Sequence, residues 1–204
     1  TDDLIEAHHK CKKLMPILHL PVQSGSTNIL MKMNRDHSIE DYFTKIEMFK
    51  KKIPRIKFSS DFIIGYPGET ESEFEATVLL MKKVKFINSF SFIYSPRPGT
   101  PAANLKMIDL KIAKERLSIF QKIADNIKKD YRDRLINSRA KVLFENKTKN
   151  KMGYFGRDEY FNSVIVTSNE NLIGKIKDVK IKECSQNTLF GQIISETNQK
   201  EFAA

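Results

Sequence analysis

The sequence is poor in cysteine, lacks tryptophan and has no long apolar run. Its 204 residues include two cysteines, Cys11 and Cys184, which lie far apart and form no disulfide framework. So few cysteines favour a reducing, cytosolic setting. No apolar run approaches the roughly 18 residues of a membrane-spanning helix, and the first residues show no signal-peptide pattern. A secreted disulfide scaffold and a helical membrane protein are both disfavoured.

An initiator methionine is also missing. The opening residues, TDDLI, read as the middle of a helical pattern, so we expect a part of a longer chain. The composition, 40% hydrophobic and 29% charged, is that of a globular protein of one or two domains. The net charge of +10 points to nucleic acid, because clustered Lys and Arg neutralise phosphates. A lysine-rich compositional bias explains the charge equally well, so both interpretations stay open.

The first part of the chain alternates strands and helices. Short apolar runs at 17–26, 56–65 and 90–94 predict strands, the first of them buried and closed by a turn. Ser38, with Asp41 three residues later, is expected to cap one helix, and Thr70 is expected to form a capping box with Glu73 at the start of another. Their expected inward faces are Tyr42, Ile46 and Phe49 in the first helix, and Phe74, Val78 and Met81 in the second. This alternation predicts parallel β/α units.

A long helix separates this part from a different pattern. Residues 109–135 form one amphipathic stretch with apolar side chains alternating four and three apart, at Ala113, Leu117, Phe120, Ala124, Ile127 and Tyr131. A coiled coil fits this spacing, but packing on the preceding domain is favoured. Five short strand-like runs follow, AKVLFEN, MGYFGR, SVIVTS, IKDVKIKEC and TLFGQII, and predict a small all-β barrel of roughly 60 residues. The domain boundary is expected near 134–138.

Ligands of parallel β/α sheets bind beyond the carboxyl ends of the strands. Three such ends are visible, PVQSG (21–25), GYPG (65–68) and SPRPGT (95–100). Glycines there allow a ligand to approach the backbone closely, and proline fixes the turns. Because Gly and Pro also punctuate ordinary β/α loops, each loop alone is weak evidence.

Four stretches, LHLPVQSGS, MNR, SSDFIIGYPGETESEFEAT and FIYSPRPGTPAA, resemble the radical S-adenosylmethionine methylthiotransferases. Within that family the last two are most similar to the branch that methylthiolates isopentenyladenosine beside the tRNA anticodon. The terminal β domain, with VLFEN, GYFGR, IGKIKDVKIKE and LFGQI, resembles the family's TRAM domain. The resemblance implies an α/β fold plus a small all-β domain. Residues 1–133 would be the second half of a partial TIM-like radical SAM barrel, 134–197 an OB-like five-stranded TRAM barrel, and 198–204 a tail.

The resemblance also implies cofactors. The family uses S-adenosylmethionine and two [4Fe–4S] clusters, one of them held by a Cys-x3-Cys-x2-Cys motif that this chain lacks. An iron–sulfur cluster needs several thiolates, so the cluster cysteines are expected outside this chain, and the chain alone is expected to be inactive. In the family a deoxyadenosyl radical removes hydrogen from C2 of the adenine, and sulfur and a methyl group are then added there.

S-adenosylmethionine contacts follow by matching residues to the family's motifs. Gln23 and Ser24 would hydrogen-bond the ribose or the amino-acid group, and Arg35 would pair with the methionyl carboxylate. Asp61, expected to be buried, would contact ribose or cap a neighbouring loop, with both roles open. The remaining contacts, which would flank the adenine or reach RNA, are Ile63, Gly65, Tyr94 and Arg97. No catalytic acid–base residue and no metal ligand is expected in the chain.

RNA is expected on the β domain. Positive side chains beside aromatic ones are typical of RNA-binding barrels, and the candidates are Lys147, Lys149, Lys151 and Arg157. The alternative is that two of the neighbouring aromatic residues, Tyr154, Phe155, Tyr160 and Phe161, belong to the core and that the lysines only decorate a hairpin. Asp158 and Glu159 are expected to oppose phosphate binding.

Other reactive residues have simpler explanations. His8, His9 and Cys11 have no familiar metal-ligand spacing and are expected at a polar helix end. Cys184 is expected in the β-domain core. Acidic residues Glu69 and Glu71 are attributed to a helix N-terminus rather than to acid–base catalysis.

The implied partners are tRNA, through its anticodon stem-loop, and an electron donor such as flavodoxin or ferredoxin. We expect a cytoplasmic monomer without a membrane contact. Sister enzymes that act on a ribosomal-protein aspartate or on threonylcarbamoyladenosine remain alternatives. A non-catalytic RNA-binding module is the alternative from another class, although retention of all three ligand loops argues against it.

Overall fold

A computed structural model describes residues 2–149 and 152–194. The chain forms two compact units, which divide between Lys128 and Lys129. Each unit has its own hydrophobic core. The first is an α/β unit and the second a β barrel, as the sequence predicted.

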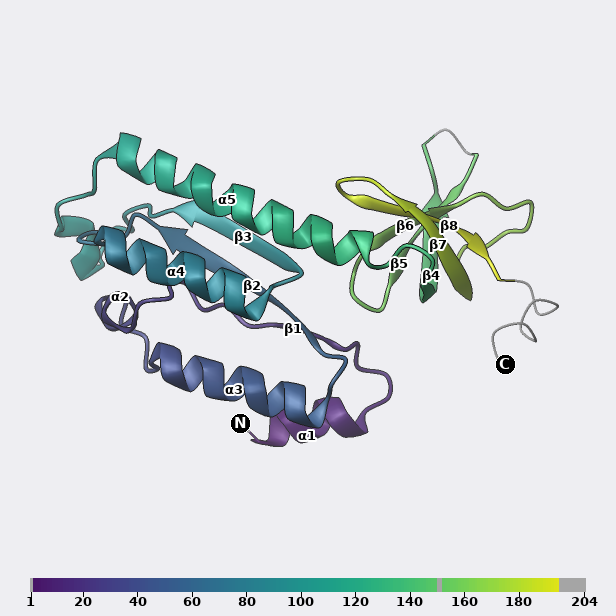
Figure 1. The fold of residues 1–204 in the computed structure, drawn as a ribbon, viewed down its shortest axis with the longest axis horizontal. Helices are drawn as coiled ribbons and strands as arrows, with labels where there is room; N and C mark the ends of the chain where they lie inside the picture. Colours follow the sequence, from purple (N-terminus) through teal and green to yellow (C-terminus); the bar gives the residue numbers. More distant parts are fainter. Residues whose placement is uncertain (1, 150–151, 195–204) are drawn as a thin grey trace. The chain divides into compact units, whose positions relative to one another are not determined.

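The α/β unit is built on a three-stranded parallel sheet (Figure 1). Its strands are β1 (Ile17–His19), β2 (Lys57–Ile64) and β3 (Asn88–Ile93), in the order β1-β2-β3. β1 is short, and its residues are half-buried or exposed rather than buried as expected. The buried part of that run comes later, at Val22, which is fully buried.

Helices connect the strands as parallel β/α units require. They are α2 (Thr27–Lys32), α3 (Ile39–Lys52) and α4 (Glu71–Val84). Both expected caps are present, and each is a capping box: Ser38 and Thr70 accept a hydrogen bond from the N3 backbone amide, and their own amides donate to the N3 side chain. All the expected inward residues of α3 are buried, as are Phe74 and Met81 of α4, while Val78 is partly buried against the core.

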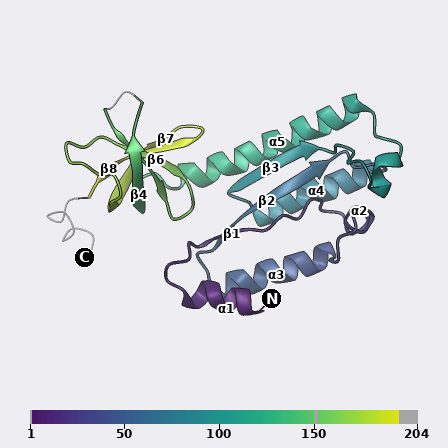
Figure 2. The same ribbon diagram turned by 180° about the vertical axis from the view of Figure 1, so that it is seen from behind.

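One face of this sheet carries the helices, and the other faces outward. Figure 2 shows the second face of β2 and β3, with α4 behind the strands. Alternate residues of each strand point to that face, and the register pairs Asp61 with Phe90 and Ile63 with Phe92. Phe90 and Phe92 are 50% and 59% exposed. This face of the sheet is therefore uncovered within the described residues.

The remaining helices are α1 (Asp2–Lys10), the short 3-10 helix η1 (Pro101–Asn104) and α5 (Leu110–Asp133). α5 packs on the α/β core rather than forming a coiled coil. Its Phe120 is fully buried, with its ring centroid 4.7 Å from that of Phe62. The alternation of apolar positions along this helix therefore matches its buried face, as predicted.

The second unit is a closed barrel of strands in the order β4-β5-β6-β8-β7. The strands are β4 (Arg139–Lys147), β5 (Tyr154–Asp158), β6 (Ser163–Val166), β7 (Ile176–Cys184) and β8 (Thr188–Ile193). Each corresponds to one of the five runs expected from the sequence. Closure leaves no long unpaired edge, and the core includes the fully buried Val142, Phe144 and Ile181.

None of the described helices is both long enough and apolar enough to cross a membrane.

Candidate functional site

The three strand-end loops share one edge of the α/β unit. Because β1, β2 and β3 are parallel, their carboxyl ends lie at the same side, toward which the arrowheads of β2 and β3 point (Figure 1). An isolated parallel bridge pairs Gln23 of the first loop with Phe62 of β2. This edge therefore holds the predicted S-adenosylmethionine residues of the strand-end loops, Gln23, Ser24, Gly65, Tyr94 and Arg97.

The loop after β1 is anchored on α4. The Gly25 amide donates to the Thr77 hydroxyl at 2.9 Å, and the Ser24 hydroxyl lies 3.3 Å from the same oxygen. A Cβ at Gly25 would collide with the backbone of Ala76. Glycine is therefore required here for close packing of the loop against α4, whether or not a ligand approaches it.

The loop after β2 is closed by its own glutamate. Gly65 has φ +74°, and its amide donates to Oε2 of Glu69 at 3.0 Å. A Cβ at Gly65 would lie 3.0 Å from the Cβ of Ala113 in α5. The turn GYPG thus has two structural reasons for its first glycine, a left-handed backbone and a tight contact with a helix.

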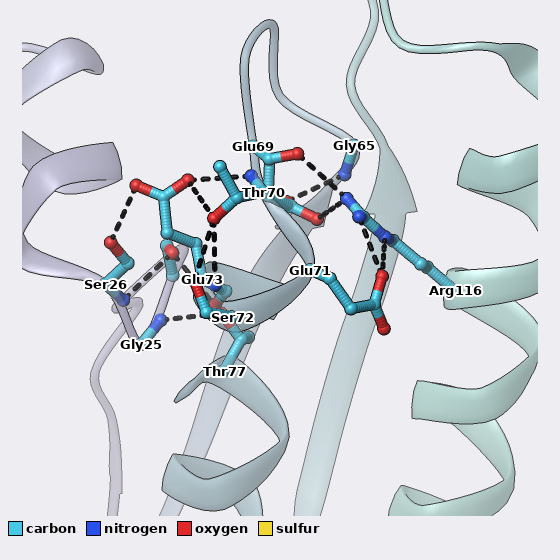
Figure 3. A network of polar contacts seen from close by, with 11 residues as sticks. Gly25, Ser26, Gly65, Glu69, Thr70, Glu71, Ser72, Glu73, Thr77 and Arg116 are labelled. Atoms are coloured by element: carbon cyan, nitrogen blue, oxygen red, sulfur yellow. Dashed lines mark hydrogen bonds and ion pairs between the residues drawn. The ribbon is translucent and has the colours of Figure 1, made fainter. Parts of the chain in front are cut away.

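An ion-pair cluster holds this loop from the side of α5 (Figure 3). Nη1 of Arg116 lies 2.8 Å from Oε1 of Glu69, and Nη2 lies 2.8 Å from Oε2 of Glu71. The side chains of Arg116 and Glu69 are 9% and 2% exposed. Burial raises the pKa of the Glu69 carboxyl, against the opposing effect of the Gly65 amide and the Arg116 guanidinium.

A second cluster joins the first two loops through Glu73 (Figure 3). Oε2 of Glu73 accepts hydrogen bonds from the amide and hydroxyl of Thr70, at 2.7 and 3.0 Å. Oε1 accepts one from the Ser26 hydroxyl at 3.4 Å. The hydrogen-bonded side chains of α4 therefore fix two of the loops relative to each other.

The predicted S-adenosylmethionine residues fall into two groups. Gln23, Ser24 and Gly65 are buried in the loops, and the Ser24 hydroxyl accepts a hydrogen bond from the Ser26 amide. Arg35 and Arg97 are exposed. The Tyr94 ring is half-buried and packs edge-on against Tyr66, with ring centroids 4.9 Å apart. Nothing in these contacts tests the proposed ligand roles, which remain predictions.

Asp61 is half-buried, and the expectation of a buried carboxylate is wrong. Its side chain is 33% exposed and lies on the uncovered face of the sheet, where Oδ2 is 3.4 Å from Nε2 of His19. Nδ1 of the same histidine lies 2.9 Å from the Ser59 hydroxyl. Ile63 occupies the same face two residues further along β2.

The described RNA candidates lie on the surface of the barrel. Lys147 is exposed with Nζ 5.7 Å from the Tyr154 ring centroid, and Lys149 is exposed. Arg157 has its guanidinium carbon 5.6 Å from the Phe155 ring centroid and its Nε 3.4 Å from Oε1 of Glu145. Lys151 lies outside the described residues.

Asp158 does not face the surface, so the expectation that it opposes phosphate binding is wrong. Its side chain is buried against the turn that follows β5, and the residue is 4% exposed. Oδ1 accepts hydrogen bonds from the amides of Tyr160 and Asn162, and Oδ2 accepts one from the Asn162 side chain. Burial raises the pKa of this carboxyl. Its role is to hold the turn at 158–162.

The described residues do not fit an iron–sulfur cluster. No group of three or more His, Cys, Asp or Glu side chains among them could hold a metal ion. Cys11 is exposed after α1, beyond His8 and His9, and Cys184 ends β7 with Sγ 3.1 Å from Oδ1 of Asp133. Both thiols are free. By contrast, the strand-end loops offer backbone and hydroxyl groups at one edge, and Arg35, between α2 and α3, is exposed; groups of these types suit a ligand with a ribose and a carboxylate.

Sequence reasoning missed Arg116. The sequence shows Glu69 and Glu71 only as the acidic start of a helix, whereas both carboxylates bind the same guanidinium. A signal was available, because Arg116 lies three residues after Ala113 and four before Phe120, on the inward face of α5. A charged residue on an apolar helical stripe needs a buried partner.

Two known families match separate parts of the chain. The Radical SAM superfamily matches residues 1–81, and the TRAM domain matches residues 133–194. The first range contains β1, β2 and the two loops that follow them. The second contains all five strands of the barrel. These matches confirm the expected fold, part of a radical SAM domain followed by a TRAM domain.

Curated relatives are similar along nearly the whole chain. The chain is 50% identical over 200 residues to tRNA-2-methylthio-N(6)-dimethylallyladenosine synthase of Pelagibacter ubique (strain HTCC1062), in an alignment that covers 98% of this chain and 45% of that protein. Proteins of the same name from Ruegeria sp. (strain TM1040) and Zymomonas mobilis subsp. mobilis (strain ATCC 31821 / ZM4 / CP4) are 42% identical over 193 residues and 43% over 204. These alignments cover 95% and 100% of this chain, and 44% and 45% of the two proteins. The chain therefore spans about half the length of the curated relatives it matches, in their C-terminal part.

Proposed function

Because the chain carries part of a radical SAM domain followed by a TRAM domain, we propose that it is the S-adenosylmethionine- and RNA-binding part of a tRNA methylthiotransferase. The enzyme would methylthiolate C2 of N6-isopentenyladenosine beside the anticodon. The observation that carries the proposal is the similarity across both units to relatives whose name describes this modification.

The cofactors of the proposed enzyme are S-adenosylmethionine and two [4Fe–4S] clusters ligated by cysteines outside this chain. They would supply the radical, the sulfur and the methyl group. The residues of this chain bind and orient. Arg35 pairs with the methionyl carboxylate, Gln23 and Ser24 present polar groups to the ribose or amino-acid group, and Ile63 and Gly65 flank the adenine. Tyr94 and Arg97 complete the pocket or reach the substrate base.

The substrate base lies in a single-stranded loop, which is where a protein can hold a base away from its stacked neighbours. The α/β unit would take that base at its strand-end loops, and the TRAM barrel would grip the flanking stem. The positive side chains proposed for that grip are Lys147, Lys149, Lys151 and Arg157. Asp158, buried against the turn that follows β5, does not repel phosphate from this surface.

Further partners belong to the same proposal. Reduction of a cluster requires an electron donor, and flavodoxin or ferredoxin has the required chemistry. A cytoplasmic monomer fits a tRNA substrate and two free thiols. The sister activities on a ribosomal-protein aspartate or on threonylcarbamoyladenosine, and a non-catalytic RNA-binding role, are the alternatives. The names of the similar proteins favour isopentenyladenosine over them.

A salt titration of tRNA affinity tests the RNA half of the proposal on the chain itself. Neutralising Lys147, Lys149, Lys151 and Arg157 together with glutamine should weaken binding and flatten its salt dependence. Each lost phosphate contact should reduce the slope of log K against log salt by about 0.7–0.9. Filter binding or fluorescence anisotropy from low to moderate salt provides the measurement.

The matched control removes four positive charges from the α/β unit. Lys45, Lys51, Lys111 and Lys114 are all exposed, and their replacement with glutamine changes the net charge equally. The control should retain most of the affinity and slope. Equal losses in the two variants would show that net charge, rather than the TRAM surface, attracts the RNA.

A further inference from the structure

Arg116 is a buried charge on a helix whose other charged residues nearby face water. The neighbouring side chains of Lys114 and Glu115 are exposed, whereas that of Arg116 is 9% exposed. It lies in α5, outside the ranges 1–81 and 133–194 that the known families match. Removing an arginine from water is unfavourable unless its donors are satisfied, so its contacts call for a functional explanation.

The hydrogen bonds of this guanidinium go to Glu69 and Glu71, in the segment that follows β2, and its carbon lies 5.5 Å from the centroid of the Phe74 ring. Nη1 donates to Oε1 of Glu69 at 2.8 Å and to the Glu69 carbonyl oxygen at 3.1 Å. Nε and Nη2 both donate to Oε2 of Glu71, at 3.2 and 2.8 Å. The guanidinium thus fixes both the side chain and the backbone of Glu69 (Figure 3).

Glu69 in turn binds the backbone at the end of β2. While Oε1 binds Arg116, Oε2 accepts the hydrogen bond of the Gly65 amide at 3.0 Å. A continuous chain of charge-assisted hydrogen bonds therefore runs from α5 through Glu69 to Gly65. Such bonds are stronger than neutral ones and specify geometry.

The start of α4 does not need this cluster. Thr70 is the N-cap, and its capping box with Glu73 satisfies the helix terminus without Glu69 or Arg116. Buried ion pairs contribute little net stability, because desolvation offsets the Coulomb attraction. What remains for the cluster to do is to hold the loop of residues 65–69 in one conformation.

We propose that Arg116 is a positioning residue. Acting through Glu69, it fixes the backbone of Gly65 at the edge of the strand-end loops, where S-adenosylmethionine would lie. The identity of that ligand rests on the proposed function, whereas the positioning is a property of the chain itself. Arg116 would not contact the ligand, since its donors are directed to Glu69 and Glu71.

The test follows glycine amides in the chain labelled with 15N-glycine. Arg116→Met removes the donors and keeps an unbranched side chain, and Arg116→Lys keeps the charge. In Arg116→Met the Gly65 amide should exchange with deuterium at least tenfold faster, and in Arg116→Lys the change should be smaller. The Gly25 amide, which binds Thr77, is the internal control and should keep its rate.

A second readout separates positioning from general stability. The Gly65 amide shift should titrate with the Glu69 carboxyl, and its midpoint should rise in Arg116→Met because the nearby positive charge is lost. The groups that face this carboxyl are the backbone amides of Gly65 and Tyr66, Arg116 and, through Arg116, Glu71.

Equal acceleration at Gly65 and Gly25, or an unchanged Gly65 amide, would overturn the proposal. If Arg116→Met does not fold, Arg116→Lys and Glu69→Gln provide the same comparison. None of these readouts requires bound cofactor, so a failed methylthiolation assay would leave the inference intact. Likewise, unchanged amide exchange at Gly65 would overturn the inference without contradicting the proposed function.

Discussion

Gly65 shows how one residue can serve both loop geometry and packing. Its backbone has φ +74°, and an added Cβ would lie 3.0 Å from the Cβ of Ala113. Each of these features alone disfavours a side chain at this position. Gly99 separates the two effects, since it has φ +81° but nothing within 4 Å of its Cβ position. Replacing either glycine with alanine should destabilise the protein, because the left-handed backbone conformation costs a residue with a Cβ about 1–2 kcal/mol.

Gly65→Ala should therefore be more destabilising than Gly99→Ala. The extra loss comes from displacement of α5 at Ala113, where overpacking typically costs about 1–3 kcal/mol. Urea unfolding of the α/β unit, followed by the backbone amide signals of α4, gives both values. Equal losses for the two variants would show that the contact with α5 relaxes freely.

Asp158 makes the stability of the barrel depend on pH in an unusual direction. Burial raises its pKa in the folded state above the unfolded value of about 3.9. The folded state therefore binds the proton more tightly than the unfolded state does. The contribution of this group to stability is fully present below the unfolded pKa and is lost as pH rises through the raised folded pKa.

Wild type should gain stability relative to Asp158→Asn as the pH falls from neutral toward about 4. Taking the difference in unfolding free energy between the two proteins at each pH cancels the titration of the other carboxyl groups. Urea unfolding followed through the amide signals of Gly156 and Gly191, which lie in β5 and β8, reports on the barrel alone. A difference that is independent of pH, or that shrinks on acidification, would contradict the raised pKa.

At the scale of elements, α5 depends on the core of the α/β unit. Phe120 is fully buried against Phe62, while its neighbour Ile119 is 52% exposed. Phe120→Ala should destabilise the α/β unit by about 3–5 kcal/mol, the range for deleting a buried aromatic side chain. Ile119→Ala should cost less than about 1 kcal/mol, since surface substitutions have small effects.

Urea unfolding of the two variants, followed through the amide signals of Gly25 and Gly65, measures this difference. Similar losses would mean that α5 does not use this face for packing.

Local sequence signals were sufficient for most elements. The capping boxes at Ser38 and Thr70 and the apolar periodicity of α5 act within a few residues, so the sequence displays them directly. Contacts between distant residues were not visible in the same way. Arg116 and Glu69 are 47 positions apart, and no local pattern pairs them.

The errors at Asp61 and Asp158 have the same origin. For each carboxylate, the sequence shows only the strand that it belongs to and its neighbours along the chain. Asp61 lies on the sheet face that carries no helix within the described residues, so it is more exposed than expected. Asp158 is buried because the following turn supplies three hydrogen-bond donors. Tertiary structure decided both positions.

At the scale of the whole molecule, the units divide close to the expected boundary, which stays a prediction. The first compact unit ends at Lys128 and the second begins at Lys129, and the TRAM match begins at residue 133. The last turn of α5 joins the barrel, since the Asn162 side chain donates to the Tyr131 hydroxyl at 3.3 Å. The expected tail, 198–204, lies outside the described residues.

The most direct test of the central claim is a chimera in which this chain replaces the C-terminal part of the Pelagibacter ubique relative, with which it shares 50% identity. The chimera is expressed in a bacterium that lacks its own enzyme, and digested tRNA is analysed by mass spectrometry. We expect 2-methylthio-isopentenyladenosine in cells with the chimera or the intact relative. The relative without its C-terminal part should leave isopentenyladenosine unmodified. A folded chimera that carries its clusters and binds tRNA, yet forms no methylthio group, would contradict the proposed function.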